Sequence, residues 1–180
     1  MDIIERLSDR RRVYEGLVIQ IDHLTATLPN GKRAPREVAV HPGASAVVPV
    51  DDAGNVYLVR QFRAPLEKVT LEIPAGKLDA PGEDRQKAAE RELKEETGLS
   101  AGNWQKLIDL ATTPGFCDEV ISIYLATALT AGKARPDEDE FVSLVKLPLH
   151  EAIDLAARGE IEDSKTVCGL LLAERVLCKK

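Results

Sequence analysis

The sequence predicts an α/β fold in which a mixed β-sheet carries helices on both faces. A small antiparallel sheet is expected N-terminal to it in the chain. Segments of strand-like and helical composition follow one another in the order strands, helix, strands, helices. Residues 44–50 also form a nearly continuous apolar run, which is typical of a strand buried on both faces. We expect residues 1–42 to form an N-terminal β-strand region and residues 43–180 to form the main domain.

The N-terminal region is predicted to contain three short strands. Residues 13–22 are rich in β-forming side chains, residues 24–28 alternate apolar and polar, and residues 35–41 follow an Asn30-Gly31 hairpin signal. Three strands bury too little apolar surface to be stable alone. We therefore expect them to pack on the main domain or on a second subunit. The arginine cluster at residues 10–12 is interpreted as part of a solvated terminus.

The elements of the main domain are predicted from turn residues and β-branched runs. In chain order they are strands at residues 44–50, 56–63 and 69–74, a helix at 83–97, strands at 104–111, 120–127 and 141–146, a helix at 148–159 and a C-terminal helix from 163 onward. The first helix contains neither Gly nor Pro, and Gly98 follows it as a left-handed terminator. Its apolar stripe, with Ala89 and Leu93, is expected to face the core.

Three carboxylates share one face of this helix. Glu92, Glu95 and Glu96 are spaced i, i+3 and i+4, and like charges so placed repel by roughly a few tenths of a kcal/mol per pair. A hard divalent cation removes that cost, and Mg²⁺ prefers oxygen ligands and bridges to substrate phosphates. The pattern therefore predicts a Mg²⁺ site, with Mn²⁺ as a substitute ion. The alternative is a solvated acidic patch on a surface helix.

Residues 83–99 resemble the Nudix box, in which a glycine and a glutamate are followed after seven residues by R-E-U-x-E-E-x-G-U, where U is aliphatic. The second part here reads Arg91-Glu92-Leu93-Lys94-Glu95-Glu96-Thr97-Gly98-Leu99. One residue more than usual separates Gly76 from Glu83, in a turn where an insertion costs little. The resemblance implies the Nudix α/β/α sandwich and a metal-dependent hydrolase.

Other segments resemble the ADP-ribose pyrophosphatase branch of the Nudix hydrolases, so the resemblance covers about residues 36–146. These segments are Arg36-Glu37-Val38, His41-Pro42-Gly43-Ala44, Gln61-Phe62-Arg63, the run from Glu72 to Asp79, and Pro114-Gly115-Phe116. The resemblance implies hydrolysis of ADP-ribose to AMP and ribose 5-phosphate. GDP-mannose and other nucleoside diphosphate sugars are alternative substrates. A non-catalytic ADP-ribose sensor is the alternative function, although sensors are expected to lose box glutamates.

The resemblance also implies substrate-binding residues. Arg63 would contact the phosphates, and a guanidinium does match phosphate oxygens bidentately; the alternative is a strand arginine in an ion pair. Arg36 has a similar implied role, with a plain edge-strand charge as the alternative. Glu72 is implied as a substrate or dimer contact and Glu119 as a substrate contact. For both glutamates, the alternative is a solvated or salt-bridged carboxylate.

The remaining implied roles concern the metal and the general base. The carbonyl of Ala75 would join the three box glutamates as a metal ligand, and Arg91 would orient those glutamates through a salt bridge. Carboxylates committed to a metal are poor proton acceptors, so the base is expected in the acidic loop at residues 137–140. Glu140 is favoured, Glu138 is the alternative, and Glu95 or Glu119 comes next. Four solvated carboxylates are the other interpretation of this loop.

Composition bounds the remaining properties. The chain has 180 residues and a net charge of −6, which argues against nucleic-acid binding by bulk electrostatics. No run approaches the ~18 apolar residues of a membrane span, and the N-terminus lacks the apolar core of a signal peptide. The three cysteines are odd in number and widely spaced, which indicates a reduced, cytoplasmic protein. In the resembling branch the N-terminal strands exchange across a homodimer, and we expect one here.

Overall fold

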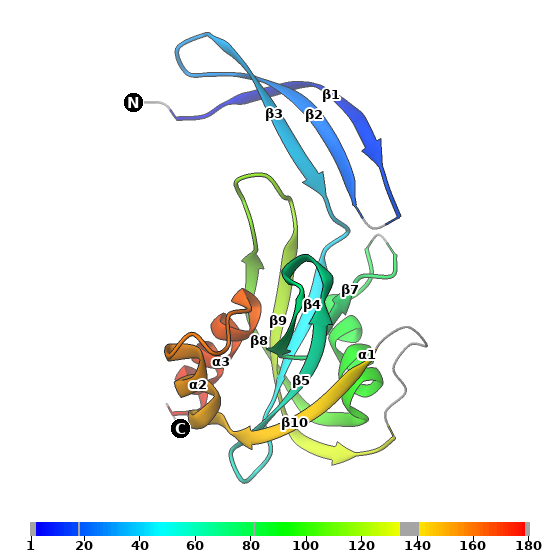
Figure 1. The fold of residues 1–180 in the computed structure, drawn as a ribbon, viewed down its shortest axis with the longest axis vertical. Coiled ribbons are helices and arrows are strands. Elements are labelled where there is room, and N and C mark those ends of the chain that lie inside the picture. The colour runs from blue at the N-terminus through cyan, green and yellow to red at the C-terminus, as the bar shows by residue number, and fades with distance from the viewer. Residues whose placement is uncertain (1–2, 18, 81, 134–140, 179–180) are drawn as a thin grey trace. The chain divides into compact units, whose positions relative to one another are not determined.

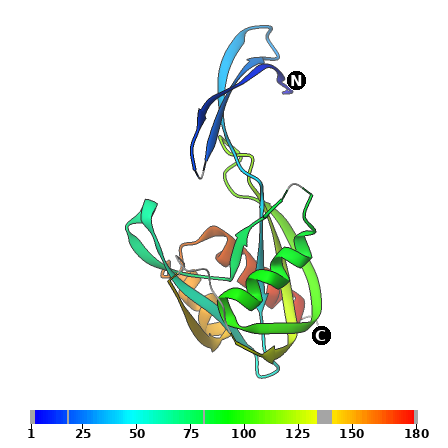
Figure 2. The same cartoon turned by 90° about the vertical axis from the view of Figure 1, so that its right-hand side faces the viewer.

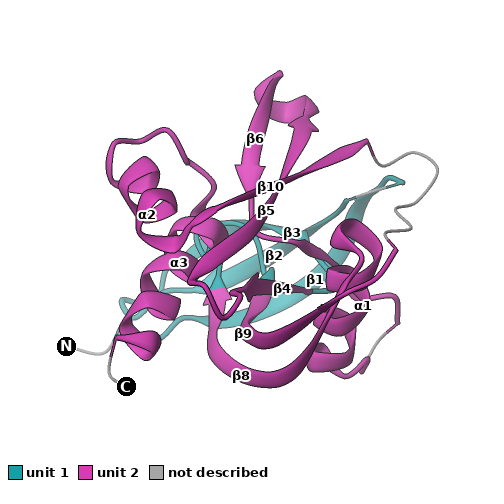
Figure 3. Cartoon of the chain, turned by 90° about the horizontal axis from the view of Figure 1, so that it is seen from below, with its two compact units in different colours: residues 1–43, 111–120 teal, residues 44–110, 121–180 magenta. Residues whose placement is uncertain are grey.

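The computed structural model describes residues 3–17, 19–80, 82–133 and 141–178. The chain forms two compact units (Figure 3), one of residues 1–43 with 111–120 and one of residues 44–110 with 121–180. The boundary expected from the sequence, between residues 42 and 43, lies beside the first junction. Residues 111–120, which we expected in the main domain, belong to the first unit.

The first unit contains an antiparallel sheet with the order β1 (Arg6–Glu15), β2 (Gln20–Thr27) and β3 (Arg33–Val40) (Figure 1). The expected Asn-Gly turn joins β2 to β3, where the Leu28 N–H donates to the Lys32 carbonyl at 2.8 Å and Gly31 has a φ of 80°.

The start of this sheet differs from the expectation. Residues 16, 17 and 19, which we expected inside one strand, lie between β1 and β2, and the Gly16 N–H donates to the Ile19 carbonyl at 2.9 Å. Strand β1 begins at Arg6, before the expected start at residue 13, and so includes the arginine cluster. Arg10 and Arg12 are not simply solvated, because both form ion pairs with the buried carboxylate of Asp22.

The second unit is built on two sheets. Its strands are β4 (Ala44–Pro49), β5 (Asn55–Arg63), β6 (Lys68–Glu72), β7 (Ala75–Lys77), β8 (Leu99–Ala111), β9 (Val120–Ala131) and β10 (Val142–Pro148). One sheet has the order β7-β4-β9-β8 and is mixed, because β4 pairs parallel to β9 and antiparallel to β7. The other, β10-β5-β6, is antiparallel. As predicted from its apolar run, β4 is buried along its whole length.

Helices cover both faces of the mixed sheet, as the sequence predicts. The helices are α1 (Arg85–Thr97), α2 (Leu149–Ala157) and α3 (Ser164–Leu177), with a short 3₁₀ turn at Ala64–Leu66. Because neighbouring residues of a strand point to opposite faces, Val47 packs against Leu93 of α1 and Val48 packs with Leu170 of α3. Figure 2 shows α1 in front of the sheet and α2 and α3 behind it. No helix within the described ranges is long and apolar enough to cross a membrane.

Caps and a close contact fix how the two main helices sit. The Asp84 carboxylate caps α1 by accepting from the backbone N–H groups of Gln86 and Lys87, and Gly98 ends the helix at a φ of 74°. Helix α3 approaches the sheet through Gly169, where a Cβ atom would lie 3.0 Å from Cγ2 of Val48. These constraints decide where the polar side chains of both helices lie.

Candidate active site

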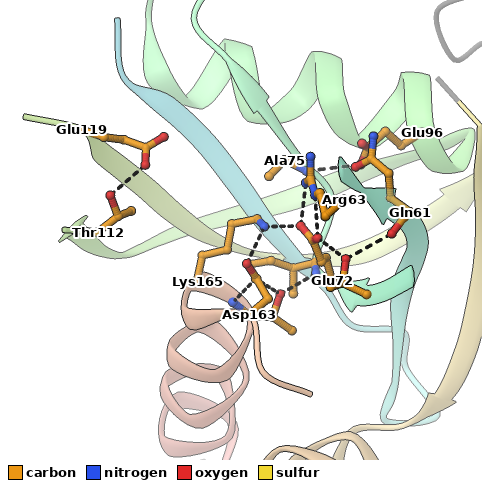
Figure 4. Close-up of polar contacts among 12 residues, drawn as sticks. Gln61, Arg63, Glu72, Ala75, Glu96, Thr112, Glu119, Asp163 and Lys165 are labelled. Atoms are coloured by element: carbon orange, nitrogen blue, oxygen red, sulfur yellow. Dashed lines mark hydrogen bonds and ion pairs between the residues drawn. The ribbon is translucent and has the colours of Figure 1, made fainter. Parts of the chain in front are cut away.

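Helix α1 and strand β7 bring two of the predicted metal ligands against Ala75. Glu92 and Glu96 are buried, at 7% and 5% exposure. The carboxylate of Glu92 lies on Gly76, where a Cβ atom would be 2.0 Å from Oε1, so glycine leaves it the room. Oε2 of Glu96 accepts a hydrogen bond from the Ala75 N–H at 3.2 Å (Figure 4). The box face and the start of β7 therefore form one site.

Arg91 binds the carboxylates of the box, as expected. Its Nη1 donates to Glu92 Oε1 at 2.6 Å and to Glu95 Oε2 at 3.1 Å, and its Nη2 donates to the Lys77 carbonyl at 3.2 Å. Burial alone would lower the pKa of Arg91, but the Glu92 and Glu95 carboxylates raise it above its ordinary value. Arg91 therefore stays charged and holds two of the three glutamates beside β7.

The donor groups at this site suit a hard cation. Among the described residues, no group of three or more His, Cys, Asp and Glu side chains is gathered closely enough to hold a metal ion by itself. Ser45 Oγ, however, is buried without a hydrogen-bond partner in the described part of the chain. Ser45 pairs with Gly76 in the sheet and, by strand alternation, shares the α1-facing side of β4 with Val47. Carboxylates and an unsatisfied hydroxyl are ligands that Mg²⁺ or its bound water can use.

Arg63 and Glu72 form a bidentate ion pair across strands β5 and β6. Arg63 Nε lies 2.7 Å from Glu72 Oε1, and Arg63 Nη2 lies 2.6 Å from Oε2. The Glu72 side chain is 2% exposed and that of Arg63 is 39% exposed. Of the alternatives that the sequence left open, the structure contains the ion pair for both residues. The pair uses two of the five guanidinium N–H groups, so it does not exhaust the donors of Arg63.

The Glu72 carboxylate has further partners. Thr70 Oγ1 donates to Oε1 at 2.5 Å, and Nζ of Lys165 forms an ion pair with Oε2. Burial alone would raise the pKa of Glu72, but the hydrogen bonds from Arg63 and the charge of Lys165 lower it to about 2. Sequence analysis missed Lys165, because it is 93 residues from Glu72 and nothing local links the two positions.

Arg36 and Glu119 lie in the first unit and line the same pocket of about 490 Å³. Arg36 is paired bidentately with Glu5, through Nε at 3.0 Å and Nη2 at 2.5 Å. Glu119 accepts a hydrogen bond from Thr112 Oγ1 at 2.7 Å, and its Oε1 lies 3.3 Å from His41 Nδ1. Both predicted substrate contacts are thus hydrogen-bonded side chains on a largely apolar pocket. The predicted bases Glu138 and Glu140 lie outside the described residues.

Comparisons with known proteins agree with this geometry. Residues 40–170 match the family model described as the NUDIX domain. The chain is 42% identical over 164 residues to the ADP-ribose pyrophosphatase of Bacillus subtilis strain 168, covering 90% of this chain and 88% of that protein. It is 43% identical over 165 residues to the methanol dehydrogenase activator of Bacillus methanolicus, covering 91% and 89%. A solved structure of an ADP compounds hydrolase has a TM-score of 0.84 at 26% identity, covering 97% and 95%.

Proposed function

The chain belongs to the NUDIX family, and we propose that it hydrolyses the pyrophosphate bond of a nucleoside diphosphate sugar, with ADP-ribose as the preferred substrate. The observation that carries the proposal is the packing of Glu92 and Glu96 of α1 against Ala75 and Gly76. The names of the B. subtilis relative and of the structural neighbour, an ADP-ribose pyrophosphatase and an ADP compounds hydrolase, support this choice of substrate. GDP-mannose is the alternative substrate.

The family generally depends on divalent metal ions, and we propose Mg²⁺ here, with Mn²⁺ as a substitute. The ligands would be Glu92, Glu95, Glu96 and the carbonyl of Ala75. The ion would polarise a phosphoryl oxygen and favour deprotonation of water. Arg91 forms ion pairs with Glu92 and Glu95. Through these pairs it would keep the two carboxylates aligned and offset their mutual repulsion.

Arg63 is proposed to bind the diphosphate while it remains paired with Glu72. The side-on pair uses Nε and Nη2, so the Nη1 edge has N–H groups left for phosphate oxygens. The buried carboxylate would fix the plane of the guanidinium before substrate arrives, which reduces the ordering that binding requires. In the first unit, Arg36 and Glu119 remain proposed substrate contacts, because both line one pocket.

The general base is proposed to be Glu140, with Glu138 as the alternative. A base outside the metal ligands is needed because a carboxylate bound to a cation is a weak proton acceptor. Glu95 or Glu119 is the next candidate; Glu95 is more exposed than Glu92 and could act as the base only if it does not bind the ion.

Two further properties are proposed with the activity. We expect a homodimer that involves the N-terminal strands. We also expect a reducing, cytoplasmic environment, which agrees with three free cysteines at positions 117, 168 and 178.

Incubation with Mg²⁺ and a substrate panel tests the proposed activity. ADP-ribose should be converted to AMP and ribose 5-phosphate with a higher kcat/KM than GDP-mannose or other nucleotide sugars. Tight binding of ADP-ribose without release of AMP would instead identify a sensor. If GDP-mannose is turned over most efficiently, the substrate assignment is wrong while the reaction class stands.

A further inference from the structure

The first turn of α3 carries a buried lysine beside the proposed phosphate contact. The side chain of Lys165 is 9% exposed, and its Nζ forms ion pairs with Glu72 Oε2 and, at 3.0 Å, with Asp163 Oδ1 (Figure 4). A buried ammonium is rare unless it is paired, and removing one partner of such a pair is costly. Lys165 therefore has a specific electrostatic role in this cluster.

The cluster is balanced in charge. Glu72 and Asp163 supply two negative charges, and Arg63 and Lys165 supply two positive charges. Both cations bind Glu72, but Arg63 is the more exposed of the two. Because charges in a protein interior are screened less than in water, the loss of one changes the potential at the others.

The same helical turn also fixes the backbone that leads to the box site. Thr166 Oγ1 accepts a hydrogen bond from the Ile73 N–H at 2.9 Å and donates to Asp163 Oδ2 at 2.5 Å. Two residues after Ile73, the Ala75 N–H donates a hydrogen bond to Glu96. The start of α3 is therefore bonded to both the side chain of Glu72 and the chain segment that carries Ala75.

We propose that Lys165 is a positioning residue that keeps Arg63 available for the diphosphate of the substrate. Lys165 binds the same oxygen of Glu72, Oε2, that accepts from Arg63 Nη2, and so shares in neutralising it; the guanidinium therefore keeps its orientation and a surplus of positive charge. Without Lys165, the carboxylates of Glu72 and Asp163 would together outweigh the charge of Arg63, so the guanidinium would lose its net attraction for a diphosphate. The inference rests on the proposed function of Arg63 as a phosphate contact.

Binding of inorganic pyrophosphate tests the inference, because every candidate substrate contains this group. The dissociation constant is measured by titration calorimetry, with EDTA present, for the wild type, Lys165→Met, Arg63→Ala and the double variant. Lys165→Met should weaken binding by about tenfold in the wild-type background. In the Arg63→Ala background it should weaken binding less than about twofold, because Lys165 acts through Arg63.

Lys106→Met is the matched control, since it removes the same charge from an exposed ion pair with Asp109 in the same unit. It should leave the dissociation constant unchanged. If Lys165→Met does not fold, Asp163→Asn/Lys165→Met removes one charge of each sign, restores the balance of the cluster and leaves the Arg63–Glu72 pair in place, with an asparagine that can still cap α3. This double variant should bind pyrophosphate within about threefold of wild type if charge is the operating factor.

Three results would overturn the inference. They are equal weakening by Lys165→Met with and without Arg63, loss of binding in the charge-balanced double variant, and no pyrophosphate binding by the wild type. Turnover of ADP-ribose by the wild type is assayed separately. A protein that binds pyrophosphate with the predicted coupling but does not hydrolyse ADP-ribose would refute the proposed function and still support the role of Lys165.

Discussion

Individual residues of the site differ in how far their roles could be predicted from the sequence. Glu92, Glu95 and Glu96 occupy one helical turn, so their common face follows from spacing alone. The ion pair between Arg63 and Glu72 could only be named as an alternative, because it depends on the register of β5 with β6. The contact between Glu72 and Lys165 joins distant segments, and no local pattern predicts it.

Glu96→Gln should lower turnover on the order of 100-fold or more at saturating Mg²⁺ while the fold survives. The substitution keeps the size of the side chain and its acceptor for the Ala75 N–H, and removes the charge that a metal ligand needs. Glu90→Gln is the matched control, since Glu90 is an exposed residue of the same helix that pairs with Gln86. Equal turnover in the two variants would remove Glu96 from the metal site.

Glu140→Gln and Glu138→Gln should identify the general base. One of the two should depress turnover strongly, by about 100-fold or more, while Mg²⁺ affinity stays nearly unchanged, because a base acts on water and not on the ion. Turnover is measured at several pH values, with calorimetric titration of Mg²⁺ as the second readout. Wild-type turnover in both variants would direct the search to Glu95 or Glu119.

Glu72 should contribute stability that depends on acid pH. Its folded pKa of about 2 lies below its ordinary 4.5, so the unfolded chain takes up the proton first as the pH falls. The contribution is complete above about pH 4.5 and is lost as the pH falls through 2. Glu72→Gln should therefore cost about 3 kcal/mol at pH 7, where it leaves buried Lys165 without this partner.

Urea unfolding at pH 3, 5 and 7 checks this expectation. The difference in unfolding free energy between wild type and Glu72→Gln should narrow from pH 5 to pH 3. A difference that does not change with pH would mean that the lost stability comes from packing and not from the charge of Glu72.

At the scale of elements, the long apolar and helical runs could be predicted from the sequence, whereas the turns and some strand boundaries could not. Strand β4 and helix α1 lie where composition and capping predict them. The β1–β2 turn was missed because β-forming residues continue through residues 13–22. Strand β8 begins at Leu99, five residues before the expected start, because pairing with β9 outweighs the weak strand propensity of Gly102 and Asn103.

Gly76→Ala tests the contact between β7 and α1. The added Cβ would meet the Glu92 carboxylate, which is the far end of a flexible side chain and can move at little cost. The melting temperature should therefore change by no more than a few degrees, whereas the Mg²⁺ concentration for half-maximal activity should rise about tenfold or more. Unchanged Mg²⁺ dependence would show that the position of Glu92 does not matter for the ion.

At the scale of the whole molecule, the first unit has an edge strand, β1, that is exposed along its whole length. Every residue of β1 is exposed, including Leu7 at 60% and Tyr14 at 55%, and Leu17 follows in the turn. A three-stranded sheet with one fully exposed strand gains little from burial, and exposed apolar side chains on it favour association. This observation supports the expectation of a second subunit that the sequence raised.

The protein should therefore be a homodimer at micromolar concentration, with a mass near twice the 19.7 kDa of one chain by light scattering. Leu7→Asp should shift the mass toward one chain, because a charge on β1 opposes burial in an interface. Leu171→Asp is the matched control, since it places the same charge on a partly exposed leucine of α3 in the other unit. A wild-type protein that is monomeric and fully active would show that the N-terminal strands need no partner copy. In that case the exposed face of β1 has another role.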